Sequence, residues 1–321
     1  MSFKILGTGR YLPENVVTND DLAKFLDTSD EWITERTGIK ERRVSINETT
    51  TDLAVGAALA ALENAGVDAS ELDMILCSTS SGDYTTPAMA CIVQQRIGAT
   101  CPAMDINSAC PAFLFMLDCA DGYFARGRVK KMLVIGAERM SRVLDWNDRA
   151  TCVIFGDGAG AVVLGEGDNY LASHIYTKGE KDIIKIPNTD GNSPFYKNVR
   201  DPIDESPYVH MKGQETFKFA VTTMCRDVRK VLAETGISEE DVKYVIPHQA
   251  NLRIIEAARK RLKTPSERVY ANIQRYGNTS SASIPIALDE LNRAGKLQAG
   301  DEIVLAAFGA GLTSAACVIR W

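Results

Sequence analysis

One cysteine stands in a position that suits a nucleophile. In the segment 103–127, Cys110 lies between a short apolar stretch and a long helical pattern, and Pro111 takes the first helical position, which proline favours. The unpaired N–H groups and the dipole at a helix N-terminus stabilise a thiolate. We therefore expect a lowered pKa for the Cys110 thiol and nucleophilic catalysis. The alternative for a lone cysteine beside alanine and phenylalanine is a buried core residue.

Two further side chains are candidate hydrogen-bond donors for the same chemistry. His248 begins the stretch HQANLRI (248–254), and Asn278 lies in YGNTSSAS (276–283). Each alone is weak evidence, because a lone histidine is more often structural and an asparagine before threonine is often in a turn. Whether they join Cys110 depends on the elements that carry them.

Those elements occur twice in the chain. The stretches 62–80 and 232–250 run in parallel, and the same offset of 170 residues relates 131–137 to 301–307. Matching residues include the pairs Gly66 and Gly236, Leu72 and Val242, Ile75 and Val245, Leu133 and Ile303, and Ile135 and Leu305. Chance similarity of two αβ units is the alternative. Agreement at one offset in two separated segments favours an internal duplication.

The offset also relates the candidate residues. It places His248 opposite Ser78 and Asn278 opposite Ser108. In a duplicated fold, equivalent strand ends from the two halves converge near a pseudo-twofold axis. We therefore expect Cys110, His248 and Asn278 to meet at one site.

Each half is predicted to hold the same α/β elements. An Ala-rich amphipathic run ends at a glycine suited to a helix C-cap, and a short apolar strand follows. A second helix and another buried strand come next, an alternation typical of strands covered on both faces by helices. The expected ranges are helices 51–64, 216–234, 111–126 and 281–294 and strands 131–137 and 302–308. No Pro/Gly/Ser-rich linker separates the halves, so we expect them to fold together.

Two segments need a separate interpretation. The polar, Pro-rich and Gly-rich segment 179–213 interrupts the repeat and is predicted to be a surface excursion, a candidate cover for a site. The stretch FGDGAGAVVL (155–164) lacks the Lys-Ser/Thr of a P-loop and is followed by a strand pattern. Its glycines are therefore predicted to serve tight turns and close packing.

The composition argues against several classes of protein. The net charge of −6 and a pI near 5.3 argue against a protein that binds nucleic acid with its whole surface. Eight cysteines without a CxxC pair, with only three histidines, favour neither a zinc site nor a disulfide framework. No apolar run approaches the roughly 18 residues of a membrane span, and the start lacks the pattern of a secretory signal. We expect a cytoplasmic protein with reduced cysteines.

Several long motifs in order resemble the signature set of the β-ketoacyl-[acyl carrier protein] synthase III family, over essentially the whole chain. The motifs are SDEWITERTGIKERR (29–43), SAC (108–110), DRAT with FGDGAGAVVL (148–164), HQANLRI (248–254) and NIQRYGNTSSASIP (272–285). The resemblance implies a thiolase-like α/β fold, in which duplicated halves form an α-β-α-β-α arrangement of five layers with mixed sheets. It places the nucleophile in the half 1–170 and the histidine and asparagine in the half 171–321.

The resemblance also implies a reaction. Cys110 would accept an acyl group from acyl-coenzyme A (acyl-CoA), and malonyl-[acyl carrier protein] would then lose carbon dioxide and attack the thioester, starting a fatty-acid chain. A thiolate is both a good nucleophile and a tolerable leaving group. Donors on His248 Nε2 and Asn278 Nδ2 would stabilise the enolate that decarboxylation produces, so no metal or other cofactor is expected.

The family's substrate-binding positions map onto further residues of this chain. Trp32 and Arg149 would stack on the adenine of CoA, with Thr28 and Arg36 beside them. A tunnel for the pantetheine arm would involve Met211, Gly213, Phe217, Ala250 and Asn251. A basic patch for the acidic carrier protein would comprise Lys218, Arg253, Lys260 and Arg261, with Arg259 nearby. The alternatives are a surface Trp-Arg packing pair and an ordinary solvated face.

Three positions depart from the family pattern. The nucleophile is followed by Pro111-Ala112 where Ala-Gly is usual, and Ser314-Ala315 replaces a common Trp-Gly. Thr86 stands where some members carry a phenylalanine that closes the acyl pocket across a homodimer. With Gly309 also assigned to that pocket, the smaller Thr86 predicts a primer range that includes branched or longer acyl groups as well as acetyl.

Other functions remain alternatives at this point. A synthase III relative could transfer acyl groups in secondary metabolism, and the departures keep that hypothesis open. A catalytically idle interaction subunit is a second alternative, although intact Cys110, His248 and Asn278 argue against it. Thiolase itself would need a second active-site cysteine, and Cys317 lies in the expected last strand rather than at a glycine turn.

Overall fold

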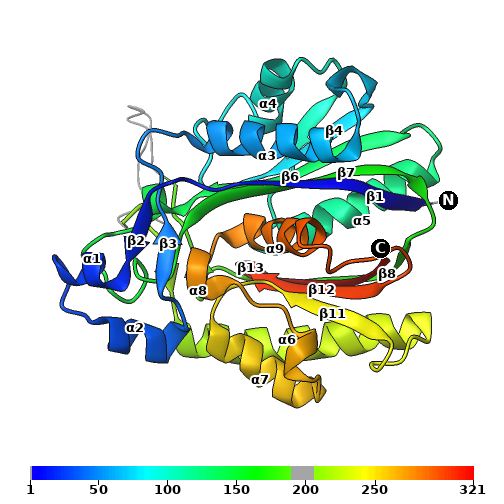
Figure 1. The fold of residues 1–321 in the computed structure, drawn as a ribbon. Helices are drawn as coiled ribbons and strands as arrows, with labels where there is room; N and C mark the ends of the chain where they lie inside the picture. Colours follow the sequence, from blue (N-terminus) through cyan, green and yellow to red (C-terminus); the bar gives the residue numbers. More distant parts are fainter. Residues whose placement is uncertain (1, 189–205) are drawn as a thin grey trace, which may run out of the picture.

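The computed structural model describes residues 2–188 and 206–321, which form five layers (Figure 1). Two β-sheets lie between three layers of helices, in the order α-β-α-β-α. Both sheets mix parallel and antiparallel strand pairs. The predicted five-layered α/β arrangement is therefore confirmed.

The two large sheets carry most of the strands. The first sheet has the order β1-β7-β6-β4-β5, and the second has the order β11-β12-β13-β8. The strands of the first sheet are β1 (Ser2–Tyr11), β4 (Met74–Ser78), β5 (Ala103–Asp105), β6 (Lys131–Arg139) and β7 (Asp157–Gly167). Those of the second are β8 (Tyr170–Glu180), β11 (Val242–Pro247), β12 (Glu302–Gly309) and β13 (Gly311–Arg320).

The two sheets repeat one topology. The run β4-β6-β7-β1 corresponds to β11-β12-β13-β8: the first pair of each run is parallel and the following pairs are antiparallel. In the second sheet, an isolated bridge between Val245 and Val269 takes the place that the pairing of β4 with β5 has in the first sheet. The second unit begins with β8 at Tyr170. This start lies one residue before the expected boundary, and the division into 1–170 and 171–321 stays a prediction.

The helices form the outer layers and the middle layer (Figure 1). The outer face of the first sheet is covered by α3 (Thr50–Ala65) and α4 (Met89–Ile97), and that of the second by α6 (Gly213–Thr235) and α7 (Leu252–Leu262). Between the sheets lie α5 (Ala112–Ala125) and α9 (Ser283–Arg293). Three buried hydrophobic clusters fill the spaces between the layers.

Local sequence signals set the helix boundaries. Both α3 and α6 end at a glycine in the left-handed conformation, Gly66 with φ 63° and Gly236 with φ 71°. Both C-caps are therefore confirmed at the positions that the repeat predicts.

Close packing of the middle layer against the first sheet requires glycine. A Cβ on Gly136 would lie 2.5 Å from the carbonyl oxygen of Ser281, and a Cβ on Gly160 would lie 2.6 Å from the amide nitrogen of Ile286. No side chain fits at such distances. Gly160 belongs to FGDGAGAVVL, so the predicted close packing of that stretch is confirmed at this residue, which lies within β7 and not in a turn.

Shorter elements gather at one end of the layers. They are α1 (Asn19–Ala23), α2 (Asp30–Thr37), α8 (Ile273–Tyr276), the pair β2 (Val16–Thr18) and β3 (Glu41–Arg43), and the pair β9 (Ile184–Lys185) and β10 (His210–Met211). The strands β9 and β10 flank part of the predicted excursion 179–213, of which residues 189–205 lie outside the described residues. Across the described ranges, the structure contains no helix with the length and apolar character needed to span a membrane.

Candidate active site

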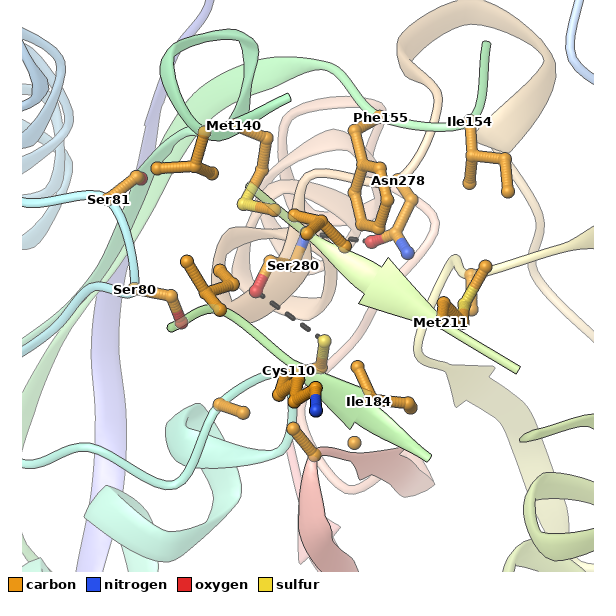
Figure 2. Close-up of a pocket in the computed structure, with 18 of the residues that line it drawn as sticks. Ser80, Ser81, Cys110, Met140, Ile154, Phe155, Ile184, Met211, Asn278 and Ser280 are labelled. Carbon is orange, nitrogen blue, oxygen red and sulfur yellow. Dashed lines mark hydrogen bonds between the residues drawn. The ribbon is translucent and has the colours of Figure 1, made fainter. Parts of the chain in front are cut away.

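Cys110 lies in the turn between β5 and α5. Its neighbour Ala109 has a φ of 53°, an uncommon conformation for a residue with a side chain. The helix begins at Ala112 with Pro111 as its N-cap, one residue later than predicted. The Cys110 Sγ lies 3.5 Å from the Ser280 Oγ, which comes from the other half of the chain (Figure 2).

The predicted lowering of the thiol pKa is wrong. Burial raises the pKa of Cys110 to about 11, and the nearby Glu138 carboxylate adds to this, against a hydrogen bond that the Ser280 hydroxyl would donate to the thiolate. At the helix start, the Ala112 N–H donates to the Ala109 carbonyl at 3.0 Å and is therefore not free to stabilise a thiolate. The Cys110 side chain is therefore a thiol at neutral pH, and the predicted role as a nucleophile requires that its proton leave.

His248 follows β11 and is almost fully buried. Its Nδ1 lies 2.7 Å from the Ser283 Oγ, and the Gln249 N–H donates to that same oxygen at 3.4 Å. We assign the Ser283 proton to the bond with Nδ1, so that the imidazole carries its own proton on Nε2, the nitrogen that is free to face the cavity. Burial lowers the pKa of His248 to about 3. At neutral pH the ring is therefore uncharged and donates through Nε2.

Asn278 lies in the turn before the short 3-10 helix Ser280–Ala282. Its N–H donates to the Ile154 carbonyl at 2.9 Å, and its own carbonyl accepts from the Gly156 N–H at 3.1 Å. The side-chain Oδ1 accepts from the Ser280 N–H at 2.8 Å (Figure 2). A backbone N–H only donates, so this contact identifies the oxygen and leaves Nδ2 as the donor end of the amide.

The sequence reasoning missed the side chains that hold these three groups. Ser280 contacts the nucleophile, Ser283 contacts His248, and the Phe308 ring packs edge-on against His248 with 5.5 Å between ring centroids. The buried Glu138 carboxylate accepts hydrogen bonds from Ser280. One available signal was the repeat itself, because Ser280 and Cys110 are separated by 170 residues.

One cavity of about 1400 Å³ joins the three predicted catalytic groups. Predicted site residues that line it are Trp32, Arg36, Cys110, Met211, Gly213, Phe217, His248, Ala250, Asn251, Arg253, Asn278 and Gly309. Apolar side chains surround the sulfur region (Figure 2), among them Met140, Ile154, Phe155, Ile184 and Met211. Within the described residues, Thr28, Thr86, Arg149, Lys218, Lys260 and Arg261 do not line the cavity.

Comparison with known proteins identifies the family. Two family models match, 3-oxoacyl-[acyl-carrier-protein] synthase III over residues 104–179 and its C-terminal part over residues 232–321. The β-ketoacyl-[acyl-carrier-protein] synthase III of Clostridium acetobutylicum is 47% identical, over 100% of this chain and 99% of the relative. The chain belongs to the β-ketoacyl-[acyl carrier protein] synthase III family. It is accordingly an acyltransferase, a condensing enzyme of fatty-acid synthesis.

Solved structures agree with this assignment. The synthase III of Aquifex aeolicus matches with a TM-score of 0.92 and 46% identity, covering 99% of this chain and 100% of that chain. The priming β-ketosynthase of the R1128 polyketide pathway also matches, with a TM-score of 0.91 but 34% identity, covering 99% and 96%. The fold is the thiolase-like fold of synthase III enzymes. The higher identities favour fatty-acid synthesis over the secondary-metabolism alternative.

The outer end of this synthase III cavity has stacked side chains. The guanidinium of Arg36 lies 4.4 Å and that of Arg149 lies 5.1 Å from the centroid of the Trp32 ring. Arg149 is also paired with Asp27, at 3.1 Å between Nη1 and Oδ2. Arg149 therefore adjoins the cavity through Trp32, and the predicted stacking residues lie together.

Two polar residues near this end differ in their partners. Asn251 donates from Nδ2 to the Arg36 carbonyl at 3.0 Å, and its Oδ1 caps α7 by accepting from the Arg253 N–H at 2.8 Å. Its side chain therefore holds α2 and α7 together at the mouth. The buried Thr28 Oγ1 has no hydrogen-bond partner among the described residues.

The residues assigned to docking and to the acyl pocket are more dispersed. Lys218, Arg253, Lys260 and Arg261 are exposed on α6 and α7. Arg259 is instead held by Glu256, at 2.8 Å between Nη2 and Oε2. Thr86 is exposed and follows residues 79–85, which line the cavity. A Cβ on Gly309 would lie 2.6 Å from the Pro111 Cδ, so this glycine lets β12 approach the nucleophile.

Proposed function

We propose that this synthase III joins an acyl-CoA primer to malonyl-[acyl carrier protein] with Cys110, His248 and Asn278 as its catalytic residues. Cys110 attacks the primer thioester, releases CoA and keeps the acyl group. Malonyl-carrier protein then loses carbon dioxide, and the resulting carbanion attacks the acyl-Cys110 thioester. The donors on His248 Nε2 and Asn278 Nδ2 stabilise the negative charge that develops on the malonyl thioester oxygen.

The observation that carries this proposal is the shared cavity. A sulfur from the first half and two hydrogen-bond donors from the second half line the same space. The donors are held in fixed orientations, His248 by Ser283 and Asn278 by the Ser280 N–H. Fixed donors need no reorganisation as charge develops, which is the property that makes such a site effective.

The proposed substrates fit the two ends of the cavity. We propose that the adenine of CoA stacks at Trp32, between a flat indole and the guanidinium of Arg36 or Arg149. The pantetheine arm would pass Gly213, Phe217 and Asn251. The exposed cations at Lys218, Arg253, Lys260 and Arg261 would guide the acidic carrier protein to the same mouth.

The cavity also supports a broad primer range. The space at the sulfur is lined by apolar side chains, including Met140, Phe155 and Ile184, which suit an alkyl chain. We propose that branched and longer acyl groups are accepted as well as acetyl. Similar rates of Cys110 acylation with acetyl-, isobutyryl- and hexanoyl-CoA would agree with this proposal, and acylation by acetyl-CoA alone would reject it.

The remaining expectations are part of the same proposal. A homodimer in the cytoplasm would place Thr86 of one subunit beside the acyl pocket of the other. We also propose that the reaction needs no cofactor, because donors on His248 and Asn278 would stabilise the enolate. All eight cysteines are free thiols in the structure, which agrees with a reducing compartment.

Mass spectrometry of the intact protein tests the proposal directly. With acetyl-CoA, the wild-type chain is expected to gain the mass of one acetyl group, and addition of malonyl-carrier protein is expected to remove it and yield 3-ketoacyl-carrier protein. The variant Cys110→Ala should gain no mass. Cys119→Ala is the matched control, because Cys119 is exposed on the same helix. An adduct that persists in Cys110→Ala and disappears in Cys119→Ala would reject the proposed nucleophile.

A further inference from the structure

A carboxylate lies fully buried behind the nucleophile. Glu138 is at the end of β6, and its exposed fraction is 0%. Its oxygens accept hydrogen bonds from Ser80, Ser81, Ser280 and Ser281, and its contacts include no cation among the described residues. Burial of a carboxylate without a neighbouring cation destabilises the folded protein. A group of this kind beside the Cys110 sulfur is therefore a candidate for a role in the chemistry.

The two oxygens of Glu138 have different surroundings. Oε2 accepts from the Ser80 N–H at 2.9 Å and from the Ser81 Oγ at 2.7 Å. The Ser81 Oγ in turn accepts from the Arg139 N–H at 2.8 Å, so its single proton is directed to Glu138. Oε2 is therefore occupied by groups that donate. Among the described residues, Oε1 faces only the hydroxyls of Ser280 and Ser281, at 3.0 and 2.9 Å, and each hydroxyl is able to donate or accept.

Ser280 connects this acid to the nucleophile. Its Oγ lies 3.0 Å from Glu138 Oε1 and 3.5 Å from Cys110 Sγ. The hydroxyl has one proton, and a carboxylate is the stronger acceptor, so the thiol is left to donate to the Ser280 oxygen. Ser280 has a φ of 48°, a strained conformation for a residue with a side chain. The backbone is thus held in an unfavourable geometry that places this hydroxyl between the two groups.

We propose that Glu138, acting through the Ser280 hydroxyl, receives the proton of the Cys110 thiol when the primer is loaded. The proposal deepens the function proposed above and rests on Cys110 as its nucleophile. Glu138 is a positioning residue in this account because it reaches the sulfur only through Ser280.

The step balances without any additional reactant. The thiol proton moves to the Ser280 oxygen while the Ser280 proton moves to Glu138 Oε1. The sulfur forms a bond to the thioester carbon, and the bond between that carbon and the CoA sulfur breaks. The departing CoA sulfur then takes the proton of the Ser280 hydroxyl, and the Ser280 oxygen takes the proton back from Glu138. Glu138 ends ionised, and the products are acyl-Cys110 and CoA with its thiol.

Cys110, His248 and Asp157 are titratable groups on elements near Glu138 and bear on its pH behaviour. The first is Cys110 at the start of α5. The second is His248 after β11, which lies on the same cavity and is uncharged, because burial lowers its pKa to about 3. The third is Asp157 on β7, which adjoins Gly158, the residue that pairs with Glu138 between β6 and β7. The oxygens of Asp157 accept hydrogen bonds from Ser45 and Ser141. Residues of the loop after β4 and of the 3-10 helix Ser280–Ala282 reach Glu138 with uncharged N–H and hydroxyl groups.

The pH dependence of Cys110 alkylation tests this inference without acyl-CoA, so its outcome is independent of the proposed reaction. A thiolate with a protonated Glu138 has the same net charge as a thiol with ionised Glu138. The wild-type rate of Cys110 alkylation with iodoacetamide should therefore be nearly constant between about pH 6 and 8. It is followed by the mass of the peptide that contains Cys110, because the exposed Cys91 and Cys119 would also add mass to the intact protein. In Glu138→Gln the form with a Cys110 thiolate and a protonated Glu138 is absent. The alkylation rate of this variant should therefore rise about tenfold per pH unit, and at pH 6 it should be at least about tenfold lower than the wild-type rate.

Matched variants separate a proton acceptor from a merely structural acid. Ser280→Ala should show the steep profile of Glu138→Gln. Ser281→Ala should keep the flat profile, because Ser281 bonds the same oxygen but does not contact the sulfur. Glu138→Asp should restore the flat profile. If circular dichroism shows that Glu138→Gln is unfolded, the comparison of Ser280→Ala with Ser281→Ala tests the proposal in its place.

Two results would overturn the inference. Equal slopes in wild type, Glu138→Gln and Ser280→Ala, with rates lowered by one factor at every pH, would assign Glu138 a structural role. A flat profile that disappears in His248→Ala but survives in Glu138→Gln would make His248 the proton acceptor.

Discussion

The two halves of the chain repeat one backbone plan and differ in the chemistry that they carry at equivalent positions. Cys110 and Ser280 are separated by 170 residues, each precedes a helix of the middle layer, and their side chains are in contact at 3.5 Å. Ser78 at the end of β4 corresponds to His248 after β11. Equivalent positions therefore meet at the site, where only the first half supplies a thiol.

The same contrast holds one strand further along. Glu138 at the end of β6 corresponds to Phe308 at the end of β12. Glu138 accepts hydrogen bonds behind the sulfur, whereas Phe308 packs edge-on against the His248 ring at 5.5 Å. The first half thus surrounds its reactive group with hydroxyls and an acid. The second half holds a neutral donor against an apolar ring, which shows how one duplicated plan provides two environments.

Removing either donor of the second half should separate condensation from acylation. In His248→Ala and Asn278→Ala, we expect the rate of condensation with malonyl-carrier protein to fall about 10²–10³-fold. The reason is that one hydrogen-bond donor to a developing oxyanion stabilises the transition state by about 2.7–4 kcal/mol. Acylation of Cys110 should fall by less than about tenfold. Rapid-quench measurement of acyl-enzyme formation and of its consumption distinguishes the two steps. Equal losses in both steps would mean that the halves do not divide the chemistry as described.

The buried imidazole should make the protein sensitive to acid. Burial lowers the pKa of His248 to about 3 in the folded chain, whereas an unfolded histidine titrates near 6.5. The unfolded state therefore binds the proton first, and stability is full above about pH 6.5 and decreases by about 1.4 kcal/mol per pH unit below it. At pH 5 this amounts to about 2 kcal/mol. Urea unfolding of wild type and His248→Asn at pH 7 and pH 5 should show this difference, and parallel pH dependences would contradict it.

The periphery of the site should respond more weakly than its centre. Trp32→Ala removes the ring on which Arg36 and Arg149 lie. An interaction of this kind contributes about 1 kcal/mol, so KM for acyl-CoA should rise about fivefold with kcat unchanged. Steady-state kinetics with saturating malonyl-carrier protein provide the measurement. A lower kcat at unchanged KM would place Trp32 in the catalytic step instead.

The smallest effect is expected at the proposed docking surface of the second half. Lys260→Glu should raise KM for malonyl-carrier protein about two- to threefold at low salt, and the difference should vanish at high salt. Lys130→Glu is the control, because Lys130 is exposed beside the opposite end of β6 from Glu138. The same effect from both substitutions would indicate net charge rather than a local surface.

Much of the fold could be predicted because its signals are local or repeated. The glycines that end α3 and α6, Gly66 and Gly236, mark helix ends by their backbone freedom. Periodic apolar residues predicted the middle helices to within two residues, and the offset predicted that both halves share one topology. Pro111 is the N-cap rather than the first helical residue, a difference within ordinary fraying of helix ends.

The protonation state of the site could not be read in the same way. A helix start beside Cys110 suggested a lowered pKa, but the pKa is raised because surrounding side chains exclude water and place Glu138 nearby. Those side chains come from distant parts of the chain, and the Ser280–Glu138 bond spans 142 residues. Contacts between residues so far apart in the sequence depend on how the elements pack together. A short sequence motif does not contain that information.

The most direct test of the division between the halves is decarboxylation in a protein that has no nucleophile. We propose measuring carbon dioxide release from malonyl-carrier protein by Cys110→Ala and by the double variant Cys110→Ala with Asn278→Ala, both without acyl-CoA. If the second half stabilises the enolate by itself, the single variant decarboxylates and the double variant is about 10²–10³-fold slower. Equal rates in the two proteins would contradict the account.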